Sequence, residues 1–350
     1  MPPAGSERAT AGASPSETSI AGIRRAAAPT AISPELASLV ENPPSGARWF
    51  HEIKFDGYRM LTHFRHGNAK LVSRNGLDWT DRFPELARTL SRLPVTEAWL
   101  DGEVVHLGSN GITSFSALQK DLSDGTTAGL IYMVFDLLYL DGWDLTAATL
   151  EDRKVLLASV IGKGRSRMGQ TIRFSDHRIG NGPEFFAAAC KRGLEGIISK
   201  ARDAAYFQGR SALWLKSKCV LQEEFVIVAF TDPKGARRGF GALLVGYYTL
   251  TGDLAYAGRV GTGFSAAFLD DFRRELQRIE RNTSTLALPK GCSAQGVHWV
   301  EPRFVAEIGF AEWTRDRILR QPRFLGLRED KAAKDVTLEL PHSSPQRERL

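Results

Sequence analysis

The sequence predicts an α+β protein of two domains, the first with mixed and antiparallel sheets and the second a small β-barrel. The chain has 350 residues, enough for two domains that each bury a core. Hydrophobic residues make up 43% and charged residues 25%, as in ordinary globular proteins, which argues against global disorder. Short β-patterned runs alternate with helical ones up to about residue 220, and β-patterned runs dominate after it.

Charge, cysteine content and hydropathy narrow the class of protein. Lys and Arg number 46 against 40 Asp and Glu, a net charge of +6 that suits a phosphate-bearing partner without establishing nucleic-acid binding. The three cysteines, Cys190, Cys219 and Cys292, are odd in number and far apart, so we expect neither a disulfide framework nor a paired zinc site. No apolar run approaches the ~20 residues that span a bilayer, so we expect a cytoplasmic protein with no membrane partner.

Both ends of the chain are expected to lie outside the folded domains. Residues 1–33 contain nine Ala, five Ser and four Pro, a composition that buries too little apolar surface to offset the entropy of ordering. We therefore predict a disordered tail over 1–33 and a polar C-terminal tail over 332–350.

The first domain is predicted over residues 34–220. A helix at 151–161 is indicated by Glu151 and Asp152 in its first turn, and one at 183–192 by Pro183 near its start. Runs rich in β-branched and aromatic residues predict strands at 49–53, 58–65, 70–73, 98–106, 131–140, 196–199 and 213–218.

The second domain is predicted over residues 221–331, with the joint near 219–222. Strands are expected at 224–230, 241–249 and 254–260, with Gly- and Asp-containing turns between them. A helical stretch at 265–281 follows, and a last strand lies near 304–310. Several strands interrupted by one helix predict a small closed barrel of the OB type.

The segment HEIKFDGYR, residues 51–59, places Lys54 at a tight turn between two strands. Taken alone, a lysine before Asp-Gly is best interpreted as an exposed charge on a β-hairpin. Further charged groups end other apolar strands, however, in SRNG (73–76), LDGE (100–103), LEGII (194–198) and WLKSK (214–218). A cleft at the strand ends would collect these groups.

The charges on these strands call for partners of opposite sign. Lys216 and Lys218 alternate along an apolar strand and therefore share one face, which is costly unless they meet an anion. Glu103 and Glu195 lie on apolar strands and equally need a cation. The set indicates a polyphosphate together with a divalent metal, and the absence of GxxxxGK[ST] means that no P-loop holds it.

Six motifs in fixed order carry a resemblance to a known superfamily. KFDGYR, SRNG, DGE, VFD, EGII and KSK follow one another between Lys54 and Lys218, as in the covalent nucleotidyltransferases: ATP-dependent DNA ligases, RNA ligases and mRNA capping enzymes. RGFGALLVGY, YAGRVGTGF and FLGLREDK, ending at Lys331, are similar to bacterial ATP-dependent DNA ligases of the end-joining type. The resemblance covers roughly residues 35–331. It implies a nucleotidyltransferase (ATP-grasp-like ligase) domain followed by an OB-fold β-barrel.

The resemblance assigns a role to each residue that matches a motif. Lys54 becomes the nucleophile that accepts AMP. The other residues bind the nucleotide or a metal: Glu52 and the backbone of Ile53 face the adenine, Phe135 stacks on it, Arg59 and Arg74 contact ribose or phosphate, Glu103 holds the ribose or a metal, Glu195 serves the metal, Lys216 and Lys218 grip the phosphates, and Arg328, Asp330 and Lys331 orient the leaving pyrophosphate. By pattern alone, Phe135 reads as a core aromatic and Asp101 as a turn residue.

The function that the resemblance implies is an ATP-dependent DNA ligase. Such an enzyme seals 5′-phosphate/3′-hydroxyl breaks in duplex DNA through a lysyl-AMP intermediate, using ATP and Mg²⁺ or Mn²⁺, in DNA repair or end joining. Its partners are nicked or broken duplex DNA and, as an open question, an end-binding repair factor. Its location is the bacterial cytosol or nucleoid.

Two alternatives remain open. An RNA ligase or mRNA capping guanylyltransferase shares the first five motifs, although GRVGTGF and FLGLREDK argue against it. The second is an inactive nucleic-acid-binding protein with a decayed pocket, against which the intact Lys54, Glu103, Glu195, Lys216 and Lys218 argue.

A lysine amine can act as a nucleophile only when it is unprotonated. The reference pKa of Lys is ~10.4, and we expect a metal and neighbouring cations, among them Arg59 and Lys216, to lower the pKa of Lys54 and free its lone pair.

We also expect the barrel to close over ATP and then swing about 219–222 to clamp DNA. The basic loop with Lys234, Arg237 and Arg238 is predicted to contact DNA phosphates.

Overall fold

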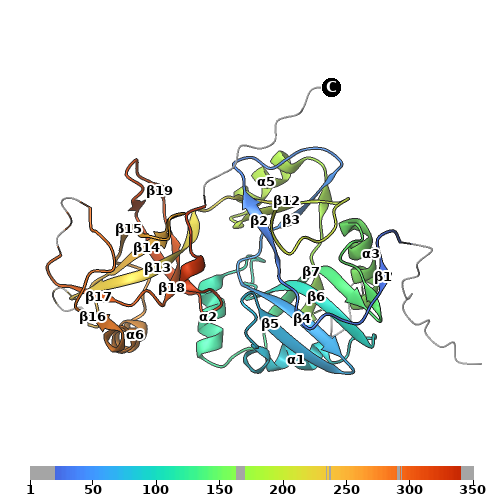
Figure 1. The fold of residues 1–350 in the computed structure, drawn as a ribbon, viewed down its shortest axis with the longest axis horizontal. Helices are drawn as coiled ribbons and strands as arrows, with labels where there is room; N and C mark the ends of the chain where they lie inside the picture. The colour runs from blue at the N-terminus through green and yellow to red at the C-terminus, as the bar shows by residue number, and fades with distance from the viewer. Residues whose placement is uncertain are drawn as a thin grey trace, which may run out of the picture.

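The computed structural model describes residues 20–162, 170–233, 235, 238–289, 292 and 294–339 of the chain. Two bodies lie side by side, one carrying the strands as far as β12 (Gly209–Lys218) and the other carrying β13 (Gln222–Thr231) and the strands after it (Figure 1). Sheets with separate helices make up both bodies, which confirms the predicted α+β class. No helix among the described residues is long and apolar enough to cross a membrane.

The first sheet is built around β7 (Ile131–Leu140), an apolar run that is buried almost throughout, as a strand covered on both faces must be. Helices α1 (Pro84–Leu90) and α3 (Leu150–Ile161) pack their leucines into the hydrophobic cluster on one face. An aromatic cluster on the other face includes Phe135 and joins this sheet to β12. In spatial order the strands are β1 (Arg24–Arg25), β8 (Trp143–Asp144), β7, β6 (Glu97–Val105), β4 (Tyr58–Arg65) and β5 (Asn68–Ser73), with β9 (Ile172–Phe174) parallel to β7.

The second sheet brings the ends of the motif-bearing strands together. Lys54 directly follows its strand β3, and the Lys54 amide donates a hydrogen bond to the carbonyl of Gly196 at 3.0 Å. Helix α5 (Gly182–Lys191) packs against this sheet. In spatial order the strands are β10 (Arg178–Ile179), β3 (Trp49–Ile53), β11 (Gly196–Ala201), β12 and β2 (Glu35–Leu39).

The third sheet forms the second body. Helix α6 (Ala266–Arg278) begins at Ser265, whose side chain accepts from the Phe268 amide, and buries Leu269, Phe272 and Leu276 in the core. The strands pair in the order β15 (Leu254–Val260), β14 (Leu243–Tyr248), β13, β17 (Val297–Val300) and β16 (Glu280–Arg281), with β18 (Val305–Gly309) between β13 and β21 (Arg323–Leu327), while β19 (Glu312–Trp313) and β20 (Leu319–Arg320) form a separate hairpin.

The closed barrel that the sequence predicted is not formed among the described residues. Strands β15 and β21, at two ends of the sheet, do not pair as a ladder. One backbone hydrogen bond, from Phe324 N to Thr262 O at 3.0 Å, joins β21 to the segment after β15. The second body is therefore a curved sheet whose two ends meet through this backbone hydrogen bond and side-chain contacts such as Phe264 with Phe324, without a ladder, as in partly open OB barrels.

The predicted disorder of residues 1–33 is wrong for residues 20–33. Strand β1 pairs with β8, and Arg24 forms an ion pair with Asp144 at 2.7 Å. The Trp99 indole donates to Pro29 O, and the Tyr139 hydroxyl donates to Ala26 O, each at 3.0 Å. The segment is ordered because it covers a sheet edge and aromatic side chains of the first body, a gain that composition alone does not reveal. Residues 1–19 lie outside the described residues.

The predicted C-terminal tail over 332–350 is likewise wrong for residues 332–339. Ala333 and Val336 are buried in the core of the second body, and the Tyr248 amide donates to Val336 O at 2.8 Å. The two buried side chains, the backbone bridge from Thr337 to Tyr248 and the packing of Leu338 hold the segment onto the sheet. Residues 340–350 lie outside the described residues.

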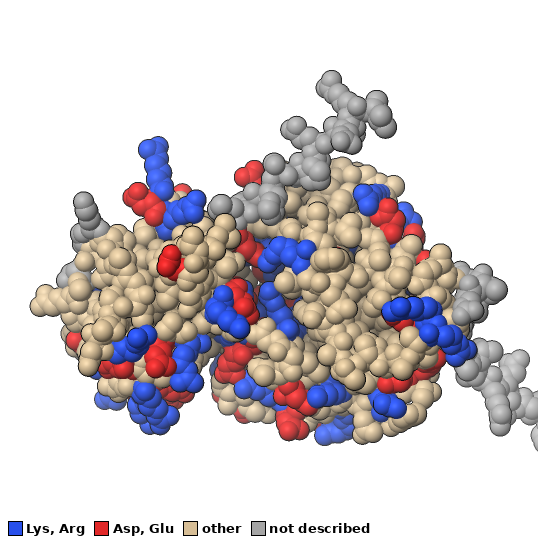
Figure 2. Space-filling model, in the orientation of Figure 1, with Lys and Arg blue, Asp and Glu red and all other residues tan. Residues whose placement is uncertain are grey.

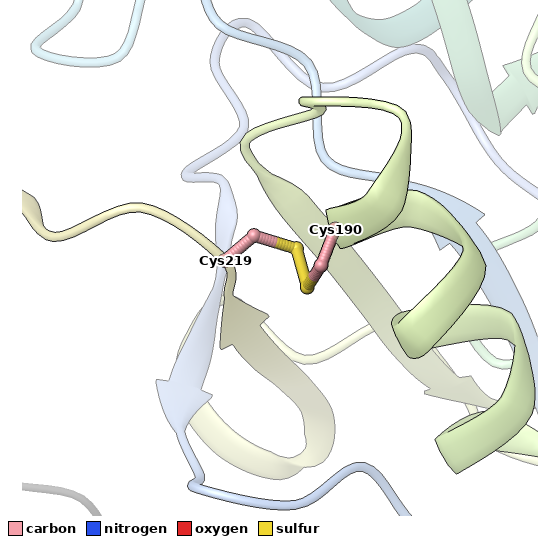
Figure 3. The surroundings of a disulfide bond; sticks show 2 residues. All are labelled: Cys190 and Cys219. Carbon is pink, nitrogen blue, oxygen red and sulfur yellow. A yellow bond between two sulfur atoms is a disulfide. The ribbon is translucent and has the colours of Figure 1, made fainter.

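A disulfide joins Cys190 to Cys219, which corrects the expectation that the cysteines stay unpaired. Cys190 lies in the last turn of α5, and Cys219 directly follows β12 (Figure 3). Gly196 opens β11 opposite Lys218 at the end of β12, so the antiparallel register brings the two cysteines within 5.1 Å between Cα atoms. The disulfide could not be predicted from the spacing of the two cysteines in the sequence, because their proximity depends on the register of β11 and β12.

We expect Cys190→Ser to lower the free energy of unfolding of the first body. The bond closes a loop with a sequence separation of 29 residues. In the chain-entropy model, loss of such a bond costs roughly 3.5 kcal/mol. Urea unfolding of the oxidised protein measures this as a lower midpoint, and Cys292→Ser, which changes an exposed free thiol, is the matched control. Equal midpoints for wild type and Cys190→Ser would contradict the prediction.

Candidate active site

A cleft of about 210 Å³ lies where the first body meets the second, lined by residues of both. Figure 2 shows basic and acidic side chains side by side along the groove between the two bodies. Of the residues to which the sequence assigned catalysis, nucleotide binding or metal binding, all but the buried Asp330 line this cleft: Glu52, Ile53, Lys54, Arg59, Arg74, Glu103, Phe135, Glu195, Lys216, Lys218, Arg328 and Lys331.

Lys54 is held in the cleft by an ion pair between its Nζ and Glu195 Oε1. Burial alone would lower the pKa of Lys54, but the charge and hydrogen bond of Glu195, with Asp56 and Glu103 adding to them, raise that pKa well above its usual range. The basic neighbours of Lys54 therefore do not lower its pKa in this arrangement, and the lowering expected from a metal stays a prediction. The nearest charge is a carboxylate, which keeps Lys54 protonated.

Two of the carboxylates that line the cleft, Glu103 and Glu195, have the properties of cation ligands. Glu195 Oε2 is buried and has no hydrogen-bond partner among the described residues. Burial raises the pKa of Glu103 to about 8, against the lowering effect of Lys54, Arg328 and Arg59. Mg²⁺ is usually bound by one or two carboxylates together with substrate phosphates. The described residues offer no group of three or more metal-binding side chains, so Glu103 and Glu195 fit a cation that arrives with phosphates.

Glu52 occupies the inner end of the cleft and is fully engaged. Its Oε1 accepts from Lys154 Nζ at 2.7 Å, and its Oε2 accepts from Ser175 Oγ at 2.8 Å and from Lys200 Nζ at 3.0 Å. Burial alone would raise the pKa of Glu52, but the two lysines lower it below its ordinary value. The sequence prediction missed both lysines.

Phe135 forms part of an aromatic wall that also holds a buried cation. Its ring meets Trp214 edge to face with centroids 5.9 Å apart, and Lys200 Nζ lies 4.1 Å from the Phe135 centroid and 4.0 Å from the Trp214 centroid. Burial lowers the pKa of Lys200 to about 8 even though Glu52 raises it. A lysine inside the apolar run 196–201 was the sequence signal that could have identified this group.

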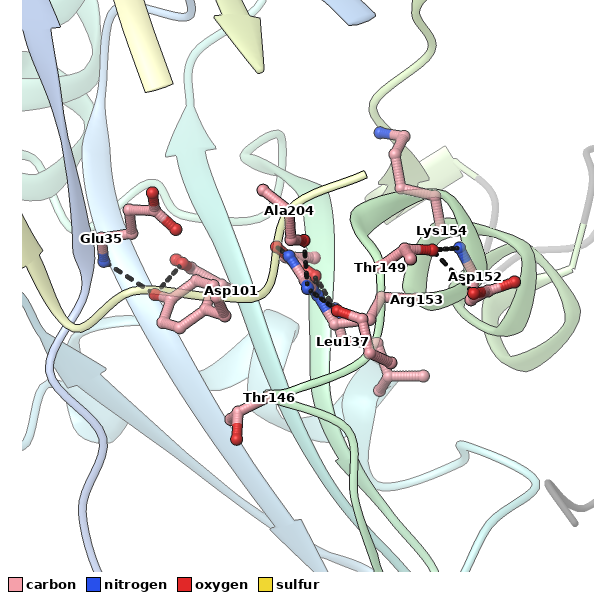
Figure 4. Close-up of polar contacts among 12 residues, drawn as sticks. Glu35, Asp101, Leu137, Thr146, Thr149, Asp152, Arg153, Lys154 and Ala204 are labelled. Carbon is pink, nitrogen blue, oxygen red and sulfur yellow. Dashed lines mark hydrogen bonds and ion pairs between the residues drawn. The ribbon is translucent and has the colours of Figure 1, made fainter. Parts of the chain in front are cut away.

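Arg59 is fixed by Asp101, which lies within β6 and is therefore not the turn residue that its Asp-Gly pair suggested. The guanidinium bonds both carboxylate oxygens, Nε to Oδ1 at 3.0 Å and Nη2 to Oδ2 at 2.6 Å. The Tyr206 hydroxyl donates to Asp101 Oδ2 at 2.7 Å and accepts from the Glu35 amide at 2.9 Å (Figure 4). This network orients the Arg59 side chain along the wall of the cleft.

A second buried ion pair supports the same wall from α3. Arg153 donates to both oxygens of Asp136 at 2.8 and 2.9 Å and to the carbonyls of Ala148 and Ala204 at 2.7 and 3.2 Å (Figure 4). Four hydrogen bonds from one guanidinium thus satisfy acceptors from three segments. The pair holds the β7 strand, and with it Phe135, against α3.

The basic side of the cleft is formed by β12. Lys218 Nζ donates to Gln222 O at 2.7 Å, and Lys216 Nζ forms an ion pair with Glu339. Burial lowers the pKa of Lys216 to about 8, although Glu339 raises it. Both predicted phosphate ligands thus line the cleft, and Lys216 has a partner that the sequence did not indicate.

Arg328 and Lys331 reach the cleft from the second body. The Arg328 guanidinium bonds both oxygens of Asp330 at 2.9 Å and Glu307 Oε2 at 3.1 Å. Lys331 forms an ion pair with Glu224. The segment is held to the first body by Gln119 of α2 (Phe115–Ser123), whose Oε1 accepts from the Leu327 amide at 2.9 Å. Of the basic loop, Lys234 and Arg237 lie outside the described residues.

Comparison with known proteins identifies the family. The family model "ATP dependent DNA ligase domain" matches residues 34–218. The chain belongs to the ATP-dependent DNA ligases. The model "ATP dependent DNA ligase C terminal region" matches residues 236–331 and extends the membership into the second body. The predicted resemblance is confirmed, and the chain is an enzyme of the DNA ligase class.

Relatives of this chain include proteins named for end joining. "Multifunctional non-homologous end joining protein LigD" of Pseudomonas aeruginosa is 44% identical over 320 residues, covering 91% of this chain and 38% of the relative. The protein of that kind from Mycobacterium tuberculosis is 36% identical over 296 residues, covering 84% of this chain and 38% of the relative. The chain thus spans 38% of the length of these curated relatives.

A solved structure carries the same fold. "Mycobacterial DNA ligase D complexed with ATP and MES" is 34% identical, with a TM-score of 0.63, covering 87% of this chain and 98% of that chain. The predicted combination of a nucleotidyltransferase domain with an OB-fold domain is confirmed at the level of fold. The roles of individual residues and the domain limits stay predictions.

Proposed function

We propose that this ligase seals 5′-phosphate/3′-hydroxyl breaks in duplex DNA through an AMP group carried on Lys54, in end joining and repair. The observation that carries the proposal is the cleft itself, where one lysine nucleophile, two cation-seeking carboxylates and basic residues from both bodies converge. The names of the relatives support broken as well as nicked DNA as substrate. The proposed location is the bacterial cytosol or nucleoid, with an end-binding repair factor as a second partner.

The nucleotide has a defined place in this proposal. The adenine lies against Ile53 and the Phe135–Trp214 wall, because a flat ring needs an apolar face on which to stack. The α-phosphate comes within reach of Lys54 Nζ, and the remaining phosphates lie toward Lys216, Lys218, Arg328 and Lys331. The basic residues neutralise the charge that phosphoryl transfer moves onto the leaving pyrophosphate.

The first chemical step requires a change at Lys54. Its amine must lose a proton and leave the ion pair with Glu195 before the nitrogen lone pair can attack the α-phosphorus. The new bond is Nζ–P, the broken bond is the one to the bridging oxygen, and pyrophosphate leaves with the electron pair. A divalent cation at Glu103 and Glu195 would neutralise phosphate charge. The Glu195 side chain can thus switch from Lys54 to that cation.

The later steps move the adenylate to DNA. An oxygen of the 5′-phosphate attacks the Lys54-bound phosphorus, the N–P bond breaks, and Lys54 recovers its amine. The 3′-hydroxyl then attacks the activated 5′-phosphorus and expels AMP, which seals the backbone. Each displacement breaks one bond at phosphorus for each bond formed.

Self-labelling tests the proposal directly. The purified chain is incubated with α-labelled ATP or GTP and Mg²⁺ or Mn²⁺, and the labelled protein is then given a nicked duplex. The expected result is label on the protein from ATP, release of that label on DNA addition, and a sealed strand. Stronger labelling from GTP, or no labelling with either metal, would overturn the proposal.

We expect Glu195→Ala to make adenylation more dependent on metal. Loss of the carboxylate removes a cation ligand, and because loss of a group that merely orients a ligand already costs about 10–100-fold in metal affinity or activity, we expect at least that effect. Titration of Mg²⁺ in the labelling assay measures the shift. Asp141→Asn, which removes a carboxylate outside the cleft and keeps its backbone contacts to Thr96 and Glu97, is the control. Superimposable titrations of wild type and Glu195→Ala would remove Glu195 from the metal site.

A further inference from the structure

A segment beyond the matched ligase region returns to the cleft. We call residues 332–339 the C-terminal strap; the C-terminal family match ends at residue 331. The strap is anchored on the second body by Ala333 and Val336 in the core and by a parallel bridge between Thr337 and Tyr248. Its last described residue, Glu339, lines the cleft together with Lys216 and Arg210 of the first body. The strap therefore connects the two bodies across the site.

Glu339 binds two of the three basic residues of β12, Lys216 and Arg210, simultaneously. Its Oε2 pairs with Lys216 Nζ, and its Oε1 accepts from Arg210 Nη2 at 2.8 Å. Burial alone would raise the pKa of Glu339, but Lys216 and Arg210 lower it to about 2, so the side chain is an anion at neutral pH. The contact places two negatively charged oxygens between two cations.

Lys216 and Arg210 form an anion-binding site, and the Glu339 carboxylate of the same chain occupies it. Lys216 lies among the predicted phosphate ligands, and Arg210, which no motif singled out, presents a second cation beside it. A guanidinium and an ammonium that together hold a carboxylate also suit the oxygens of a phosphate. A phosphate and the Glu339 carboxylate cannot occupy the same place.

We propose that Lys216 and Arg210 form a phosphate subsite, and that Glu339 on the C-terminal strap is an internal competitor that must leave before a phosphate enters. The inference rests on the proposed function, because the phosphate belongs to the nucleoside triphosphate or to the DNA backbone. Arg210 thereby becomes a phosphate-binding residue of the cleft. Because the strap is anchored on the second body, its release is coupled to movement of that body relative to β12.

Equilibrium binding in a chain that cannot form the adenylate tests the competition. Lys54→Ala and Lys54→Ala with Glu339→Gln are compared by calorimetric titration with ATP, with inorganic tripolyphosphate and, separately, with nicked duplex DNA. We expect Glu339→Gln to tighten binding by about 10-fold, an effect that shrinks with added salt. Tightening for ATP and tripolyphosphate identifies the nucleotide as the source of the phosphate, and tightening for DNA alone identifies the backbone. Either result supports the subsite.

A second substitution separates competition from a purely structural role. With Glu339→Gln in place, Arg210→Gln should weaken binding of the same ligand by about 10-fold, because Arg210 then contacts phosphate. Glu312→Gln removes a charge from an exposed ion pair with Arg320 and is the matched control, expected to change nothing. Unchanged binding in Glu339→Gln for all three ligands, or weaker binding, would overturn the proposal, since a residue that merely positions Lys216 weakens binding when removed.

Labelling of the wild-type chain distinguishes the two proposals. If the chain with Lys54 intact accepts label from ATP while Glu339→Gln leaves every affinity unchanged, only the internal competitor is wrong. If the wild-type chain accepts no label, the proposed function itself fails. In the labelling assay, Glu339→Gln is expected to lower the KM for the phosphate source without changing the rate at saturation.

Discussion

Lys54→Ala is expected to reduce labelling of the chain by α-labelled ATP to background. The labelled bond is Nζ–P, and alanine supplies no atom that can form it. The described cleft contains other lysines, but Lys216 is paired with Glu339 and Lys200 is held by Glu52 and two aromatic rings. Lys54 is the lysine that pairs with Glu195 and is under the charge of Glu103, the two carboxylates proposed to serve the metal.

The same variant separates the first step from the last. Sealing of a nick that already carries AMP on its 5′-phosphate does not use the Lys54 amine, so part of that activity should survive. Peptide mapping of the labelled wild-type protein locates the AMP, and Lys70→Ala, at an exposed lysine paired with Asp78, is the control. Full labelling of Lys54→Ala would place the adenylate on another residue.

The strand ends that build the cleft were predictable because each motif places a charged residue where an apolar strand stops. The ranges 49–53, 58–65, 131–140 and 254–260 are the bounds of β3, β4, β7 and β15 in the structure. The bounds of these strands are set by the local sequence, where polar and apolar residues alternate strongly or apolar residues form a continuous run. The short strands of the second body and helices α1 and α2 were missed because their patterns are short and their contacts are distant in sequence.

The partners of the charged residues could not be predicted in the same way. The pairs Lys54–Glu195, Arg59–Asp101 and Lys216–Glu339 are separated by 42 to 141 positions, and each depends on how strands are placed in the folded chain. The expected lowering of the Lys54 pKa by basic neighbours is not found for this reason: the sequence indicates which cations could be nearby, whereas the structure puts a carboxylate in direct contact. The disulfide between Cys190 and Cys219 depends on register in the same manner.

Arg328→Ala combined with Lys331→Ala is expected to lower self-adenylation by about 10²–10³-fold, at the lower end of what cationic stabilisation of phosphoryl transfer can contribute. Both side chains enter the cleft from the second body, where Asp330, Glu307 and Glu224 hold them. They are positioned for a leaving pyrophosphate, which only the first step produces. The measurement is the single-turnover rate of label transfer from ATP to the protein.

Sealing of pre-adenylated nicks by this double variant decides between a moving and a static second body. If that body closes over ATP and then swings away to admit a duplex, Arg328 and Lys331 leave the reacting atoms before sealing, and the variant should retain sealing activity.

Replacing Lys234, Arg237 and Arg238 should instead weaken DNA binding and its salt dependence while sparing adenylation. Retained sealing also excludes misfolding as the cause of slow adenylation, because an unfolded chain loses both steps. Equal loss of both steps in the two sets of variants would mean that the same face of the second body serves ATP and DNA alike.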